Sequence, residues 1–307
     1  MTLTTASCSR ALDGTAHVAI NPTYGTGTIP VSVRYRIMGA PGAPLYILAG
    51  GTSAGRRASA TSDETQSGWW ESGVAELDLE RHQILSIDWL TAHDIEAPVI
   101  ATGDQAQAIA GVIAELGEVA HGFIGYSYGG MVALAFAEQQ PLDSLVVASA
   151  AHRSHPMATA LRVIQRRIVA LRPGNEGLAL ARALAVTTYR SSDEFADRFS
   201  AKPTVGPTRF SVESYLDAVG ERFVAAVSPS RFLALSESAD LHNVVPAHIN
   251  ATTTLIAIRQ DRLVPLEDMR TLAGAIGGPV RLHEVDGHYG HDTFLKEPAR
   301  IAALLPL

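Results

Sequence analysis

The chain has 307 residues, of which 47% are hydrophobic and 18% are charged, and its formal net charge is −7. The apolar content excludes a disordered chain, and the acidic balance argues against a nucleic-acid or anionic-membrane binder. The single cysteine, Cys8, excludes an internal disulfide and leaves no cysteine cluster for a metal. Because neither a membrane span nor a signal-peptide pattern is found, we expect a cytoplasmic protein.

Short apolar runs alternate with helical patterns over the first 150 residues. Strands are predicted at 31–37, 45–49, 84–89, 123–126 and 144–148, and helices at 104–116 and 128–139. Thr102 and Gln105 fit a capping box that begins the first of these helices. Alternating strands and helices are typical of parallel βαβ units.

Residues 153–245 have a different pattern, in which helical segments follow one another. Helices are predicted at 157–171, 176–189, 192–199, 212–227 and 230–239, and strands return at 253–258 and 280–285. We therefore predict an α/β core formed by residues 1–152 and 246–307, with a helical lid insertion at 153–245. Open α/β sheets bind ligands at the carboxyl ends of their strands, so the lid is expected to cover the site.

The segment Gly125-Tyr126-Ser127-Tyr128-Gly129 matches the G-x-S-x-G nucleophile elbow. In this motif the serine occupies a strained turn between a strand and a helix, and small residues two positions away let the two backbones approach closely. The apolar run before Ser127 and the helical pattern after it supply that context. Ser127 is therefore the candidate nucleophile.

A serine nucleophile needs a base, and the elbow fold takes its triad in the order Ser, Asp, His. His291 is favoured as the base over His288, because a glycine precedes it and a helix-like segment follows it. Asp261 follows the strand at 253–258 and is favoured as the acid that orients the imidazole. Asp88 and Asp286 are weaker alternatives.

An acyl-transfer intermediate also needs two converging amide donors for its oxyanion. One is the N–H of Tyr128, the residue after the nucleophile. The other is expected in the glycine pair after the strand at 45–49, where Gly50 is favoured and Gly51 is the alternative.

Three segments, 125–134, 261–265 and 289–295, resemble the homoserine O-acyltransferases, which have the α/β-hydrolase fold. The histidine motif of that family, Tyr-Gly-His-Asp-Ala-Phe-Leu, is matched by residues 289–295 with Thr293 in place of Ala. Further matches lie at 177–190 and 212–216. The resemblance implies a triad of Ser127, Asp261 and His291, and a substrate site in which Arg182 binds the α-carboxylate and Asp292 the α-ammonium of homoserine.

The resemblance also implies acyl-CoA as co-substrate, no bound cofactor or metal, and a homodimer formed through the helical insertion. The sequence departs from the family at Tyr128, where methionine is usual, and at residues 49–52, which read Ala-Gly-Gly-Thr in place of Ala-Leu-Thr-Gly. The Gly50-Gly51 type resembles the succinyl-transferring branch, so succinyl-CoA is slightly favoured over acetyl-CoA. Serine O-acyltransferases and esterases of the same fold are the alternatives.

Two further features have weaker interpretations. Arg162, Arg166 and Arg167 share one predicted helix, where a solvated face is favoured over contacts with CoA phosphates. The pair Trp69-Trp70 is interpreted as core or pocket wall.

Overall fold

The computed structural model describes residues 11–204 and 206–307, so Cys8 lies outside the described part. Its centre is an eight-stranded sheet in the order β1-β2-β4-β3-β5-β6-β7-β8. The pairs β1–β2 and β2–β4 are antiparallel, and all pairs from β4–β3 to β7–β8 are parallel. The strands are Ala11–Ile20 (β1), Ile29–Gly39 (β2), Leu45–Ala49 (β3), Gln83–Ile87 (β4), Ala120–Tyr126 (β5), Ser144–Ala148 (β6), Thr252–Ile258 (β7) and Val280–Val285 (β8).

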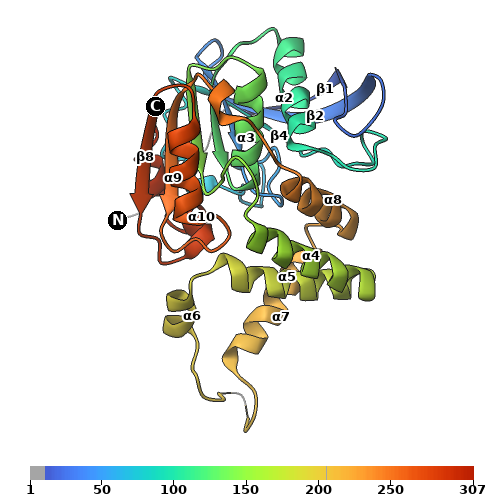
Figure 1. The fold of residues 1–307 in the computed structure, drawn as a ribbon, viewed down its shortest axis with the longest axis vertical. Helices are drawn as coiled ribbons and strands as arrows, with labels where there is room; N and C mark the ends of the chain where they lie inside the picture. Colours follow the sequence, from blue (N-terminus) through green and yellow to red (C-terminus); the bar gives the residue numbers. More distant parts are fainter. Residues whose placement is uncertain (1–10, 205) are drawn as a thin grey trace.

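Helices cover both faces of the sheet (Figure 1). One face packs on α2 (Thr102–Leu116), α3 (Tyr128–Gln139) and α9 (Leu266–Ala275). The other packs on α1 (Glu71–Val74), α10 (Thr293–Lys296) and α11 (Pro298–Ala302). Because both faces are covered, the central strands are buried over nearly their whole length, which explains their continuous apolar runs.

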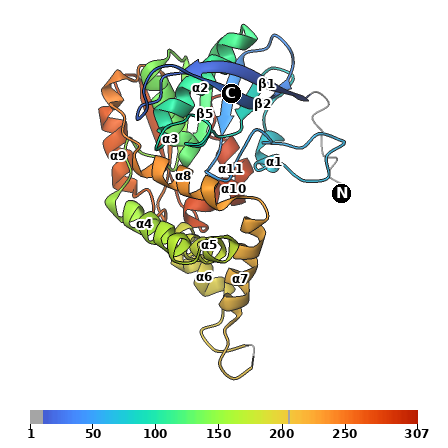
Figure 2. The same ribbon diagram turned by 90° about the vertical axis from the view of Figure 1, so that its right-hand side faces the viewer.

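The helices between β6 and β7 form a layer beside the carboxyl ends of the strands (Figures 1 and 2). Both views place α6 and α7 farthest from the sheet and α8 against it. Val169, Leu178 and Phe232 belong to a small apolar core within this layer. The helices are Pro156–Leu171 (α4), Asn175–Tyr189 (α5), Ser192–Arg198 (α6), Ser211–Val224 (α7) and Pro229–Asp240 (α8).

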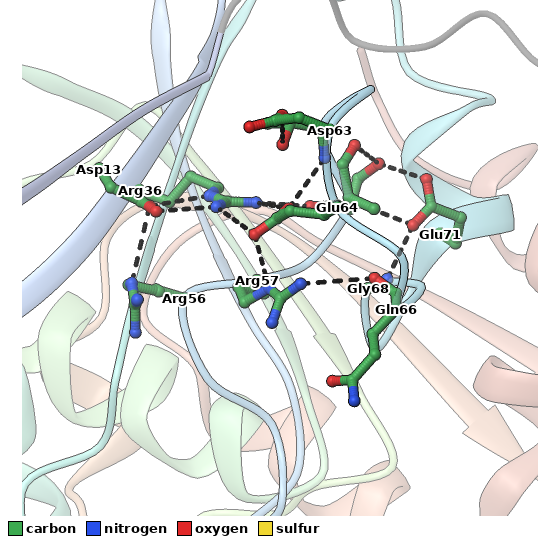
Figure 3. Close-up of polar contacts among 12 residues, drawn as sticks. Asp13, Arg36, Arg56, Arg57, Asp63, Glu64, Gln66, Gly68 and Glu71 are labelled. Carbon is green, nitrogen blue, oxygen red and sulfur yellow. Dashed lines mark hydrogen bonds and ion pairs between the residues drawn. The ribbon is translucent and has the colours of Figure 1, made fainter.

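Arg36 of β2 connects the segment before α1 to the sheet through hydrogen bonds and ion pairs (Figure 3). Its buried guanidinium donates paired hydrogen bonds to Asp13 at 2.8 Å and to Glu64 at 2.8 and 2.9 Å. The hydrogen bonds from Arg36 lower the pKa of Glu64 to about 2, so this carboxylate stays charged at neutral pH. Glu71 closes the same segment by accepting the hydroxyl hydrogen bond of Ser59 at 2.5 Å.

Trp69 and Trp70 lie in the same segment before α1. Both pack on the sheet, in agreement with their interpretation as core residues. Trp70 is buried and donates its indole N–H to the carbonyl of Phe294 at 2.9 Å. Trp69 donates to the carbonyl of Gly55 at 3.0 Å, which ties it to the loop after β3.

Two local predictions are corrected. The strand β1 was not predicted, because its N-terminal half alternates weakly and is mostly exposed. The helix α2 begins at Thr102 itself, and Asp104 caps it by accepting the N–H of Ala101 at 2.8 Å, so Gln105 is not its capping residue. Within residues 11–204 and 206–307, no helix is long and apolar enough to cross a membrane.

Candidate active site

Ser127 lies in the turn between β5 and α3, with a backbone φ of 54° and ψ of −121°. A positive φ is strained for a residue with a side chain and is sustained only by its surroundings. A Cβ on Gly125 would lie 2.4 Å from the carbonyl oxygen of Gly129, and one on Gly129 would lie 2.3 Å from that of Ala49. Both positions therefore require glycine, and together they allow the tight turn that presents the Ser127 hydroxyl.

A continuous hydrogen-bonded chain joins Ser127, His291 and Asp261. His291 Nε2 lies 2.8 Å from Ser127 Oγ, and its Nδ1 lies 2.7 Å from Asp261 Oδ2. The other oxygen of Asp261 accepts the backbone N–H groups of Leu263 at 2.9 Å and Val264 at 3.0 Å. Because these bonds fix the carboxylate, the imidazole is held with Nδ1 as donor and Nε2 as acceptor toward the serine.

Burial and charge act in opposite directions on His291. The side chains of His291 and Asp261 are 7% and 0% exposed. Burial by itself lowers the pKa of His291, but the charge and hydrogen bond of Asp261 and the charge of Asp292 raise it above its ordinary value overall. The site therefore favours the imidazolium that forms when His291 accepts the serine proton.

The alternative candidates for the base and the acid are not part of this hydrogen-bonded chain. His288 is exposed, and its Nε2 lies 3.7 Å from Asp197. Asp88 is paired with Arg56 at 2.6 Å, and Asp286 is exposed beside Arg259.

The two segments predicted to supply oxyanion donors lie against each other. Gly129 N–H donates to the carbonyl of Gly50 at 2.8 Å, which joins the end of β3 to the first turn of α3. Tyr128 and Thr52 line the cavity that contains Ser127. The phenol of Tyr128 is buried and hydrogen-bonded to Ser238 of α8 at 2.8 Å, so this residue connects the elbow to the helical layer.

The cavity in front of Ser127 encloses about 790 Å³, its open mouth included. Its floor is formed by the elbow and by His291, and one wall is formed by a single face of α4. Tyr189, at the end of α5, lines the cavity and lies 5.8 Å from His291 between ring centroids. The helical layer thus narrows access to the nucleophile.

The two residues expected to bind substrate are not on the wall of this cavity. Arg182 lies over the rings of Tyr189 and Phe223, at 5.2 and 4.8 Å from their centroids. It lines a second depression with Arg190 and other cations. Arg182 makes no hydrogen bond or ion pair with the residues that the structure describes, and Tyr189 separates it from the cavity.

Asp292 is buried in an ion-pair cluster that the sequence did not reveal. Its Oδ2 lies 3.0 Å from Nε of Arg190, without the alignment of a hydrogen bond. Arg190 Nη1 also contacts both oxygens of Glu194, at 3.1 and 3.2 Å. Arg198 Nη1 lies 3.5 Å from Glu194 as well, so the cluster pairs two carboxylates with two guanidinium groups.

The interpretation of Arg162 and Arg166 as a solvated face is wrong. Both side chains are mostly buried and contact one carboxylate, Asp240 at the end of α8, at 2.7 Å. Of the three arginines, only Arg167 is exposed. No signal in the sequence marks Asp240 as their partner, because the two helices are brought together by tertiary packing. Among the residues that the structure describes, no group of three potential ligands for a metal occurs.

Comparison with known proteins agrees with this geometry. Residues 16–304 match the family described as the alpha/beta hydrolase family. The chain is 42% identical over 297 residues to a homoserine O-succinyltransferase of Xanthomonas campestris, covering 92% of this chain and 80% of the relative. It is 28% identical over 344 residues to a serine O-succinyltransferase of Litchfieldella anticariensis, covering 92% and 94%.

Among solved structures, a homoserine O-acetyltransferase of Staphylococcus aureus has the same fold, with a TM-score of 0.83. The two sequences are 23% identical, and the match covers 97% of this chain and 96% of that one. The chain therefore belongs to the alpha/beta hydrolase family and, within it, to the homoserine O-acyltransferases.

Proposed function

We propose that the protein is an acyltransferase that moves an acyl group from acyl-CoA to the hydroxyl of homoserine through an acyl-Ser127 intermediate. The observation that carries the proposal is the hydrogen-bonded chain from Ser127 through His291 to Asp261, in a chain 42% identical to a homoserine O-succinyltransferase. The product is an O-acylhomoserine, a precursor of methionine.

In the first half-reaction, His291 Nε2 takes the proton of Ser127 as Oγ attacks the thioester carbonyl. The amides of Tyr128 and Gly50 stabilise the oxyanion. The new bond joins Ser127 Oγ to the acyl carbon, the C–S bond breaks, and the proton on His291 passes to the departing thiolate.

In the second half-reaction, the homoserine hydroxyl gives its proton to His291 and attacks the acyl carbon. The bond to Ser127 Oγ breaks, and the serine recovers its proton from the imidazole. We assign the α-ammonium of homoserine to Asp292 and its α-carboxylate to Arg182. For the second contact, the ring of Tyr189 that lies between Arg182 and the cavity has to turn aside.

Ping-pong kinetics follow from this scheme, because CoA leaves before homoserine reacts. The test measures thiol release from succinyl-CoA and acetyl-CoA, each with homoserine, with serine and with water alone. We expect release that depends on homoserine, and a mass increase on Ser127 when homoserine is omitted. Ser127→Ala should lower turnover by at least about 1,000-fold.

Two results would contradict the proposal. Full-rate release without an amino acid would identify an esterase, and dependence on serine in place of homoserine would identify the serine O-acyltransferase alternative.

We further propose a homodimer formed through the helical insertion. Leu171 and Leu180 on α4 and α5 are 85% and 59% exposed, so both apolar side chains of the helical layer are available to a second copy of the chain. Sedimentation should give twice the mass of one chain, and Leu180→Glu should shift it to the monomer. A monomeric wild-type protein would contradict this arrangement.

A further inference from the structure

The second depression, beside the cavity that contains the nucleophile, is lined by a group of basic side chains from α5, α6, α7 and α10. These residues are Arg182, Arg190, Arg198, Arg222 and Lys296. Among the residues that the structure describes, no acidic side chain lines the depression, although the formal net charge of the chain is −7. The depression encloses about 940 Å³, its open mouth included. The helical layer and α10 thus create a local excess of positive charge on an acidic protein.

Two of these cations are neutralised by the protein, and three are not. Arg190 and Arg198 belong to the ion-pair cluster that contains two carboxylates. Arg182, Arg222 and Lys296 make no ion pair with any residue of 11–204 or 206–307. Arg222 and Lys296 are also exposed, so their charged ends are available to a ligand at the mouth of the depression.

Aromatic rings hold two of the guanidinium groups at this surface. Arg182 lies over the ring of Phe223 at 4.8 Å from its centroid, and Arg198 lies over the ring of Tyr215 at 4.2 Å. Both rings line the depression. A guanidinium that stacks on a ring keeps the N–H groups along its edge free to bind an anion.

The depression and the cavity that contains Ser127 have neighbouring walls. Ser53 lines the depression, and the preceding residue, Thr52, lines the cavity. Tyr189 also lines the cavity, and its ring contacts the guanidinium of Arg182 in the depression. A long ligand whose reacting end is at Ser127 can therefore place its other end among the basic side chains.

We propose that Arg222 and Lys296 bind phosphate groups of the CoA moiety of the acyl donor at this depression. The proposal rests on the proposed function, because it takes acyl-CoA as the donor. The phosphates of CoA are separated from the thioester by the long pantetheine arm, so their site should lie beside the nucleophile cavity and not inside it. Guanidinium and ammonium groups are the side chains that bind phosphate oxygens best.

The number and the arrangement of the unpaired cations favour this ligand over other anions. The α-carboxylate of homoserine carries one negative charge and has its own candidate partner in Arg182, which leaves Arg222 and Lys296 without a role. A nucleic acid or an anionic membrane would need a broad basic surface, whereas these cations line one concave site on an acidic chain.

The experiment compares the same acyl group carried by CoA and by pantetheine, because the pantetheine thioester has the same reacting end and no phosphate. The wild type should have the lower KM for the CoA thioester. Arg222→Gln and Lys296→Gln should each raise that KM by about 3- to 10-fold with little change in kcat, since the phosphates take no part in the chemical step. Neither variant should change the KM of the pantetheine thioester by more than about 2-fold.

Arg167→Gln is the matched control, because it removes one positive charge from an exposed position of the helical layer outside the depression. An equal rise of KM for both thioesters would overturn the proposal, since it would show that the variants disturb the nucleophile cavity. A rise confined to the KM of homoserine would overturn it in favour of amino-acid binding.

Calorimetric titration with free CoA and with pantetheine separates this proposal from the proposed function, because it needs no turnover. The wild type should bind CoA more tightly than pantetheine, and the double variant Arg222→Gln/Lys296→Gln should lose most of that difference. If this result is obtained while no acyl group reaches homoserine, the phosphate site stands and the acceptor in the proposed function is wrong. Equal binding of CoA and pantetheine by the wild type would overturn the phosphate site.

Discussion

His291 and Asp292 are neighbours in the chain, and their charges are coupled. The charge of Asp292 contributes, after that of Asp261, to raising the pKa of His291 against the effect of burial. A base works in its neutral form, so a raised pKa moves the loss of activity on acidification to higher pH. At the scale of single residues, the raised pKa of His291 therefore stabilises the imidazolium during the reaction but lowers activity at acidic pH.

We expect Asp292→Asn to shift the acidic limb of the pH profile to lower pH, because the variant lacks a charge that raises the pKa of His291. The quantity to measure is kcat/KM for the acyl-CoA donor, which reports the acylation step and not homoserine binding. Asp286→Asn, at an exposed position, is the control and should leave the limb in place. An unchanged limb in Asp292→Asn would show that the coupling is absent.

At the scale of elements, α8 is tied to both segments that are proposed to stabilise the oxyanion. Arg231 Nη2 donates to the carbonyls of Ala54 at 2.8 Å and Thr52 at 3.3 Å in the loop after β3. Seven residues later, Ser238 holds the phenol of Tyr128. Residues seven positions apart lie on the same face of a helix, so one face of α8 holds both Tyr128 and the loop after β3 in place.

Arg231→Gln should therefore lower kcat for acyl transfer by about 10-fold with little change in KM, because oxyanion donors act mainly in the transition state. Steady-state kinetics with both substrates check this. Glu237→Gln, exposed on the same helix, is the control and should be neutral. A change confined to KM would indicate that Arg231 acts on substrate access and not on the oxyanion loop.

At the scale of the whole molecule, His242 connects the end of the helical insertion to the core through two hydrogen bonds. Its Nδ1 accepts from Thr102 Oγ1 at 2.8 Å, and its Nε2 donates to the carbonyl of Ala151 at 3.1 Å. Burial lowers the pKa of His242 to about 3, so the folded protein holds it neutral.

Because the unfolded chain protonates this histidine near pH ~6.5, the free energy of unfolding should fall as pH decreases from about 6.5, by at most about 1.4 kcal/mol per pH unit. Urea unfolding between pH 7 and pH 5 measures this slope above the titration range of most carboxylates. His242→Gln should flatten the slope, although it also lowers stability at pH 7. A slope equal to that of the wild type would assign the pH dependence to other groups.

The sequence by itself determined the order of most strands and helices and the α/β-hydrolase fold, because apolar periodicity and the glycine spacing around Ser127 are local properties. It also singled out Ser127, Asp261 and His291, since each follows a predicted strand in the order that the elbow fold requires. The strand β1 was not predicted, because its N-terminal half is mostly exposed and has little apolar pattern.

Only the tertiary structure decided which charges meet. Arg162 and Asp240 are separated by 78 residues in the chain, and Asp292 meets Arg190 across about 100, so no local pattern could pair them. The same is true of α8, whose contacts with Tyr128 and Thr52 depend on how the helical layer packs on the sheet. Local sequence sets the chemistry of each side chain, whereas the packing of distant elements sets its partner, its burial and its pKa.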